Sequence, residues 1–138
     1  GELADRGARL AFPGDRLIHG NMFGDQVIVD GVSVGIVDWD DLCMGDPLYD
    51  VGRLLASTLF TCLRSGAEPR GASSLLRGYE LGGGSVERDR LRWHACAALL
   101  LRAKISALRQ LPETWIEDVA RSVSEAESLL AGQRELTP

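Results

Sequence analysis

The sequence has few lysines, cysteines and histidines, and it has no long apolar run. Lys104 is the single lysine beside fourteen arginines, and these arginines are scattered along a chain whose net charge is −5. A net acidic chain without a basic cluster argues against nucleic acid as a partner. The longest uninterrupted apolar run, ACAALLL at residues 95–101, is too short to span a bilayer. We therefore expect neither a nucleic-acid partner nor a membrane partner.

Cysteine is also scarce, with Cys43, Cys62 and Cys96 the three examples. They are too few and too far apart for a disulfide framework, and no pair has the spacing of a zinc finger. We therefore interpret them as small core residues of a cytoplasmic protein. The N-terminal segment GELADRGARL has no apolar stretch after basic residues, so it does not resemble a signal peptide.

The apolar spacing predicts one β-hairpin followed by helices. VIVD and SVGIVD are separated around Asp30 and Gly31, a pair that favours a two-residue hairpin turn. Asp46 before Pro47 has the pattern of a helix N-cap followed by a first-turn proline. One face of that helix would carry Leu48, Val51, Leu55, Leu59 and Cys62. The expected fold class is α+β and mostly helical, with one β-hairpin carried on a helical bundle.

Three further helices are expected after residue 67. The first would cover residues 68–81 and end at a run of glycines, and the second would be capped by Ser85. The third would open at LPETW, residues 111–115. We predict a single domain in which residues 1–45 form a loop-and-hairpin region, residues 46–132 a helical scaffold and residues 133–138 a tail.

Polar side chains gather at one end of the predicted hairpin. Gln26 precedes the first strand and Asp38 ends the second, so the hairpin should bring the two side chains together as oxygen ligands. A hard cation such as Mg²⁺ is held by one or two such oxygens together with phosphate and water. Asn21, five residues before Gln26, would lie in the same loop. Two metal ligands and a loop residue that orients a hydroxyl form the arrangement needed for phosphoryl transfer.

The segments HGNMFGDQVIVD and GIVDWDDLCMGDPLYDVGRLLA resemble the aminoglycoside phosphotransferase and choline kinase family, relatives of protein kinases. The family pattern is H-G-D-x-x-x-x-N, then I-D-[WF], then G-D-P-x-x-D-L. The resemblance places Asn21 at the catalytic aspartate position and Gln26 and Asp38 at the metal-binding positions. The other matching residues are His19, Gly20, Gly45, Asp46, Pro47 and Asp50.

The resemblance implies a fold and a reaction. It makes residues 1–45 the catalytic-loop and metal-binding hairpin region and residues 46–132 the substrate-side region. The fold is the C-terminal lobe of a kinase-like phosphotransferase, and ATP is the co-substrate with Mg²⁺ as the cofactor. The other substrate is a small molecule with a hydroxyl group. His19, Asp46 and Asp50 would support the loop, although Asp46 could serve only as an N-cap and Asp38 only as a turn former. Asp40 is a candidate substrate contact.

Two departures from the family pattern concern activity. A carboxamide at Asn21 does not accept a proton as a carboxylate does, and loss of a general base costs on the order of 10²–10⁴-fold in rate. Asn21 could still orient a hydroxyl by accepting a hydrogen bond through Oδ1. The family's N-terminal lobe, with its phosphate-binding strand lysine, has no counterpart in this sequence. We expect a phosphotransferase parent, weak or no activity of this chain alone, and an N-terminal lobe or partner chain over the exposed face. The alternative is a pseudokinase-like, non-catalytic interaction module.

Overall fold

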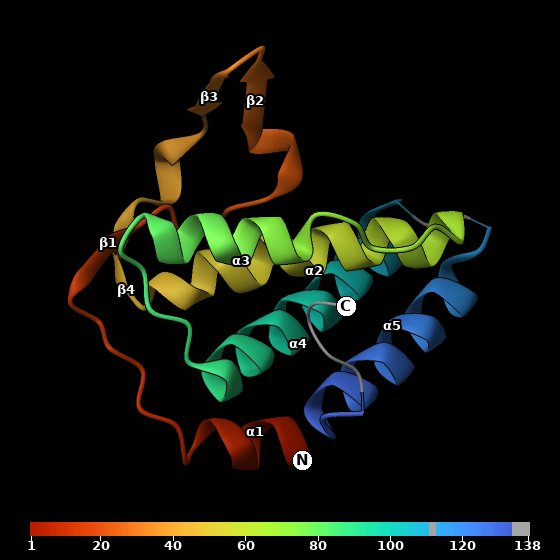
Figure 1. Cartoon of the computed structure of the whole chain (residues 1–138). Coiled ribbons are helices and arrows are strands. Elements are labelled where there is room, and N and C mark those ends of the chain that lie inside the picture. The colour runs from red at the N-terminus through yellow and green to blue at the C-terminus, as the bar shows by residue number, and fades with distance from the viewer. Residues whose placement is uncertain (111–112, 134–138) are drawn as a thin grey trace.

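The computed structural model describes residues 1–110 and 113–133 (Figure 1). It confirms an α+β chain that is mostly helical. The helices are α1 (Glu2–Gly7), α2 (Pro47–Ser65), α3 (Ala72–Leu81), α4 (Arg88–Ile105) and α5 (Trp115–Leu130). The strands are β1 (Arg16–Ile18), β2 (Val27–Asp30), β3 (Ser33–Ile36) and β4 (Cys43–Gly45). Short helical turns cover η1 (Gly24–Gln26), η2 (Trp39–Asp41) and η3 (Ser106–Gln110), the last of them π-helical.

The strands form two separate antiparallel pairs. Strands β2 and β3 form the predicted hairpin, in which Val27 lies opposite Ile36 and Asp30 lies opposite Ser33. Strands β1 and β4 form a second pair, with Ile18 opposite Cys43, which the sequence analysis did not predict. Each of these strands has three residues, too few to show an alternating pattern. Because β1 precedes the hairpin and β4 follows it, their pairing brings the two ends of the hairpin segment together.

Helix α2 has the predicted start and the predicted buried face. The carboxylate of Asp46 accepts a hydrogen bond from the backbone N–H of Leu48 at 3.0 Å, and Pro47 is the first helical residue. The helix ends at Gly66, whose φ of 69° lies in the left-handed region that glycine adopts without strain. Its buried apolar residues include Leu48, Val51, Leu55 and Leu59.

The later helices begin at residues other than those predicted. Helix α3 starts at Ala72, after Gly71 with a φ of 91°. Helix α4 is capped by Glu87 rather than Ser85, because the Glu87 carboxylate accepts the first free backbone N–H groups of the helix. Helix α5 begins at the tryptophan of the predicted LPETW start, whose residues 111–112 lie outside the described residues. Residues 134–138 of the predicted tail also lie outside them, and the predicted division at residue 45 stays a prediction.

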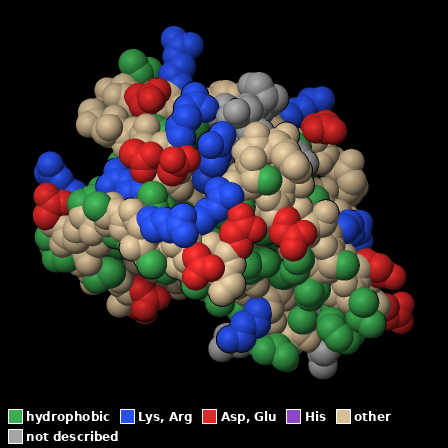
Figure 2. Space-filling model, turned by 90° about the horizontal axis from the view of Figure 1, so that it is seen from below, with side chains coloured by type: hydrophobic (Ala, Val, Ile, Leu, Met, Phe, Trp, Pro, Cys, Tyr) green, Lys and Arg blue, Asp and Glu red, His purple; other side chains and the backbone are tan. Residues whose placement is uncertain are grey.

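The apolar core lies between the helices, with α4 packed against both α2 and α5 (Figure 1). One cluster joins these three helices and includes Phe60, Cys96, Leu99 and Leu129. A second cluster joins α2 and α4 with the start of α3 and contains Leu48, Val51, Leu55, Ala72 and Leu91. On the underside shown in Figure 2, basic side chains gather in one area with acidic side chains beside them.

The cysteines differ in burial. Cys96 is fully buried in α4, and burial raises the pKa of its thiol to about 12, so it stays protonated. Cys62 is partly buried, but Cys43 on β4 is exposed, so the prediction that all three are core residues is wrong for Cys43. Within the described residues, the helices are all too short or too polar to cross a membrane.

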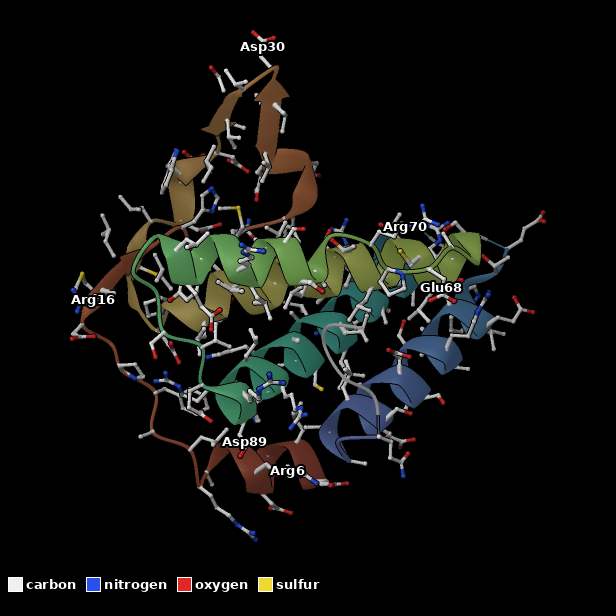
Figure 3. All side chains as sticks on the ribbon, viewed as in Figure 1. Arg6, Arg16, Asp30, Glu68, Arg70 and Asp89 are labelled. Atoms are coloured by element: carbon white, nitrogen blue, oxygen red, sulfur yellow. The ribbon has the colours of Figure 1, made fainter. Side chains whose placement is uncertain are left out.

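The hairpin stands away from the helices, and Figure 3 shows Asp30 at its far tip. Its apolar side chains are largely exposed, including Ile28 at 54%, Val29 at 66% and Val34 at 65%. Neither face of the hairpin is therefore packed on the core. The expected lobe or partner chain over an exposed face stays a prediction.

Candidate functional site

The carboxylate of Asp50 anchors the loop after β1 to α2. The backbone N–H of His19 donates to Asp50 Oδ2 at 2.6 Å, and the backbone N–H of Gly20 donates to Asp50 Oδ1 at 3.0 Å. Asp50 therefore uses both of its oxygens to hold two consecutive peptide groups. This geometry is what a loop-supporting residue would require.

The His19 side chain joins the loop to the end of the hairpin. Its Nδ1 accepts a hydrogen bond from the backbone N–H of Asn21 at 3.4 Å, and its Nε2 lies 2.9 Å from the carbonyl oxygen of Val37. A carbonyl oxygen only accepts, so Nε2 donates to Val37 while Nδ1 accepts from the loop backbone. The ring is 2% exposed. Both nitrogens are used in holding the loop, which fits a structural role better than proton transfer.

Gly20 allows the loop to pass close to the chain after β3. Its φ is 79°, and a Cβ at this position would collide with the backbone carbonyl of Asp41. A side chain here would therefore be strained and would also push η2 away from the loop.

Asn21 is held by a buried arginine that the sequence analysis missed. Arg53 on α2 is 5% exposed and donates from Nη2 to Asn21 Oδ1 at 2.6 Å. A guanidinium has only donors, so the oxygen of the carboxamide must face it and the amide nitrogen must point away. Oδ1, which was expected to accept a substrate hydroxyl, already accepts a hydrogen bond from the protein. The amide N–H₂ of Asn21 is left as the group directed away from the arginine.

The Arg53 guanidinium has further contacts that fix its position. Its Nη1 donates to the hydroxyl of Tyr49 at 3.0 Å, and its central carbon lies 4.3 Å from the centre of the Phe23 ring. Arg102 on α4 lies 4.6 Å from the same ring centre. Cations over aromatic rings are attracted by the ring electrons. The loop residue Phe23 is therefore held between the side chains of α2 and α4.

Gln26 and Asp38 do come together, as the spacing predicted, but not as two free oxygens. Gln26 donates from Nε2 to Asp38 Oδ2 at 2.9 Å, and its Oε1 accepts the backbone N–H of Phe23 at 2.6 Å. The carboxylate of exposed Asp38 fits Mg²⁺, which binds proteins through one or two carboxylates. The carboxamide of buried Gln26 does not fit in this orientation, because its N–H₂ faces the position where a cation would bind to Asp38. Its role as a metal ligand stays a prediction that requires the amide to turn.

Asp38 is also the one non-glycine residue with a positive φ among residues 1–110 and 113–133, at 67°. Aspartate tolerates the left-handed region better than most residues, yet such conformations cost free energy and occur often at functional sites. The conformation turns the chain from β3 into η2. Because the carboxylate is held by Gln26, the turn and the side-chain position are fixed together.

Asp46 and Asp40 lie away from this loop contact. Asp46 Oδ1 caps α2, while Oδ2 accepts a hydrogen bond from His94 Nε2 at 3.1 Å and lies 3.8 Å from Arg90 Nε. Asp46 thus ties α2 to α4. Burial lowers the pKa of His94, and its Nδ1 is buried without a hydrogen-bond partner among the described groups. Asp40 is exposed in η2, and its contact with a substrate stays a prediction.

Of the residues that sequence analysis missed, Arg53 alone has a signal in the sequence. Arg53 interrupts an otherwise apolar stretch of α2, and a lone arginine at such a position needs a partner when it is buried. The spacing of the chain does not show which partner that is. The contacts of Tyr49, Phe23 and Arg102 depend on how α2, α4 and the loop are packed, so no local pattern reports them.

Hydrogen bonds thus join the loop of Asn21 to the strand-end Asp38 and to the helix that carries Asp50. Residues 2–96, more than two thirds of the chain, match the family model described as "Phosphotransferase enzyme family". The class of this protein is therefore that of the phosphotransferases. The chain belongs to this family, which confirms the resemblance to aminoglycoside phosphotransferases and choline kinases. Comparison with curated proteins and with solved structures gave no match.

Proposed function

We propose that this chain is the C-terminal catalytic lobe of an ATP- and Mg²⁺-dependent O-phosphotransferase that acts on a small molecule. The observation that carries the proposal is the hydrogen bond between Gln26 and Asp38, which closes the loop of Asn21 onto the strand-end aspartate. The three positions that the family uses for catalysis and metal binding lie in this loop and at this strand end. Family membership supports the reaction class.

The side chains have distinct proposed roles. Asp38 binds Mg²⁺, which neutralises charge on the phosphates of the nucleotide when it is bound. His19 and Asp50 hold the loop in position, as their hydrogen bonds indicate. Asn21 faces the acceptor substrate with its amide N–H₂, because Arg53 occupies its oxygen. It positions the acceptor but removes no proton, so we expect weak activity.

The first test measures Mg²⁺-dependent nucleotide binding in a two-lobed form of the protein. Asp38→Asn removes the charge but keeps a residue that tolerates a positive φ. Asp30→Asn at the hairpin tip makes the same change far from the loop (Figure 3). We expect Asp38→Asn to abolish Mg²⁺-dependent binding and Asp30→Asn to leave it intact. Equal Mg²⁺-dependent nucleotide binding by the unchanged protein and both variants would contradict a metal site at Asp38.

The second test restores a base at position 21. In the two-lobed protein, Asn21→Asp should raise turnover at least about tenfold, because proton removal by a positioned base contributes about 10²–10⁴-fold. Arg53 would donate to the new carboxylate and keep it ionised. Adding Arg53→Gln to Asn21→Asp should therefore change the pH dependence of turnover. Unchanged turnover in Asn21→Asp would mean that the substrate hydroxyl does not lie at this residue.

A non-catalytic interaction module is the second candidate function. The fixed orientation of two carboxamides favours it. Asn21 Oδ1 accepts a hydrogen bond from Arg53, and Gln26 Oε1 accepts one from the backbone N–H of Phe23, so neither oxygen is left for a substrate or a metal ion. The exposed apolar hairpin would then be the surface that binds another chain. Absence of nucleotide binding even with the N-terminal lobe present would support this alternative.

A further inference from the structure

A cavity of about 420 Å³ lies between α2, α4, η3 and α5. This volume is within the range of small-molecule sites, which is roughly 300–1,000 Å³. Its charged lining residues are Arg64, Arg102, Arg121 and Asp118. Phe60 and Ile105 contribute apolar wall, so both a charged group and a carbon skeleton have matching surfaces.

The charges of the lining do not balance. Asp118 is buried, and its carboxylate pairs with Arg64 at 3.2 Å and with Arg121 at 3.3 Å. One negative charge is thus shared by two guanidinium groups. Arg102 has no ion pair with a carboxylate of the described residues. The cavity therefore has a formal excess of two positive charges, which favours an anionic ligand.

Ser106 provides a second and independent observation. It lines the same cavity and is 3% exposed, and its Oγ has no hydrogen-bond partner among the described groups. A buried hydroxyl without a partner costs free energy, so a ligand oxygen that pairs with it would be stabilised. Ser106 also begins the π-helical turn η3, and such turns often occur at functional sites.

Arg102 connects this cavity with the loop of Asn21. Its guanidinium lies beside the Phe23 ring, and Phe23 also packs against Arg53, the partner of Asn21. Arg102, which lines the cavity and has no carboxylate partner among the described residues, therefore contacts the loop that carries Asn21. A ligand held by Arg102 would lie on the α4 side of that loop.

We propose that this cavity binds a small organic anion, with a carboxylate or a phosphate ester as its charged group. Arg102 and Ser106 bind the anionic oxygens, and Phe60 and Ile105 pack against the carbon skeleton. Insofar as the proposed function holds, the anion is part of the acceptor substrate, which is then an anionic rather than a cationic alcohol. The net acidic charge of the whole chain does not predict this, because the cavity has the opposite sign.

The test uses four aromatic probes of similar size and different charge, with the full chain and without nucleotide or Mg²⁺. Phenyl phosphate and benzoate are the anions, benzyl alcohol is neutral and benzylamine is cationic. Titration calorimetry should show binding of at least one anion and at least about tenfold weaker binding of benzyl alcohol and benzylamine, since a charge-assisted hydrogen bond is roughly twice as strong as a neutral one. The better of the two anions identifies the charged group. Benzylamine binding as tightly as the anions would overturn the proposal.

Variants locate the binding in the cavity. Arg102→Gln and the smaller change Ser106→Ala should each weaken binding of the preferred anion, the first by at least about tenfold. Arg77→Gln removes an arginine of α3 that does not line this cavity and should leave binding unchanged. If Arg102→Gln does not fold, Ser106→Ala decides alone. Anion binding that survives both cavity variants would overturn the proposal.

The outcome is separate from that of the nucleotide experiment. Anion binding with no Mg²⁺-dependent nucleotide binding would leave the cavity as a ligand site and reject the phosphotransferase reaction of this lobe. Nucleotide binding that depends on Asp38, together with a preference for benzylamine, would reject the anionic substrate alone.

Discussion

The loop-and-hairpin region, residues 16–45, and the helical region, residues 46–130, are held in place by different interactions. In the helical region, residues such as Leu99 and Leu129 are 0% exposed and pack between three helices. In the hairpin, apolar residues such as Val34 remain 65% exposed. Burial of apolar surface therefore stabilises the helices, whereas the hairpin depends on polar contacts at its base.

Those polar contacts are few and specific. At the hairpin base, the backbone N–H of Val37 donates to the carbonyl of Gln26 at 3.1 Å. His19 also contacts the carbonyl of Val37, and Gln26 donates to Asp38. Asp50 then fixes the loop to α2. The candidate site thus lies where the two regions meet. Its residues are positioned by hydrogen bonds to the rigid helices rather than by a core of their own.

The largest expected effect comes from deleting core volume. Leu99→Ala in α4 should lower the free energy of unfolding by about 2–5 kcal/mol, because it removes buried methyl groups and leaves a cavity. The same substitution at Leu17 in β1, which is 65% exposed, should cost far less. Chemical denaturation of both variants measures the difference. Similar losses at the two leucines would contradict the contrast between the regions.

The next effect concerns the joint between the two regions. Asp50→Ala leaves the backbone N–H groups of His19 and Gly20 without their acceptors and should cost about 1–3 kcal/mol. Hydrogen exchange should show faster exchange at these two amides while the amides of α4 stay protected. Asp30→Ala makes the same change at the exposed hairpin tip (Figure 3) and should leave the exchange of both amides unchanged. Protection that persists in Asp50→Ala would mean that another group holds the loop.

The difference between the regions also explains what the sequence could predict. Helix α2 was predicted because its apolar residues recur at helical spacing, and the hairpin because Asp30 and Gly31 predict a turn. The structure places that turn one residue later, at Gly31 and Val32, because Asp30 still pairs with Ser33. Both signals are local. The contact between Gln26 and Asp38 was also predictable, because the two residues lie at the same end of the paired strands. The orientation of the Gln26 amide was not predictable, because it depends on the backbone N–H of Phe23 in the folded loop.

Contacts between distant segments were beyond the reach of local patterns. The hydrogen bond from Arg53 to Asn21 joins residues that lie 32 positions apart, and neither local sequence indicates this partner. The pairing of β1 with β4 depends likewise on the closure of the whole loop-and-hairpin region. Exposure of Cys43 follows from that pairing, because its strand lies at the surface.

A smaller effect should appear as a pH dependence of the helical region. Burial lowers the pKa of His94 below its ordinary value of 6.5, beside Asp46 and Arg90. The unfolded chain therefore binds a proton that the folded chain does not bind as the pH falls below about 6.5. Stability is full above that pH and decreases as the pH falls toward the lower pKa of the folded state.

Thermal unfolding between pH 8 and pH 5 measures this dependence. His94→Gln removes the titrating group and should flatten the curve between about pH 6.5 and pH 5, although it also loses some stability at every pH. A curve as steep as that of the unchanged protein would assign the pH dependence to other groups.

The smallest expected effect is at the hairpin surface. Val34→Thr adds a hydroxyl to a side chain that is already 65% exposed and should change stability by no more than about 0.5 kcal/mol. The same substitution at Val51, which is 8% exposed in α2, places a hydroxyl in the core and should cost about 1–3 kcal/mol. Denaturation of the isolated chain compares the two valines directly. Equal losses would mean that the hairpin is covered in solution by another copy of the chain, and both regions would then be stabilised by burial.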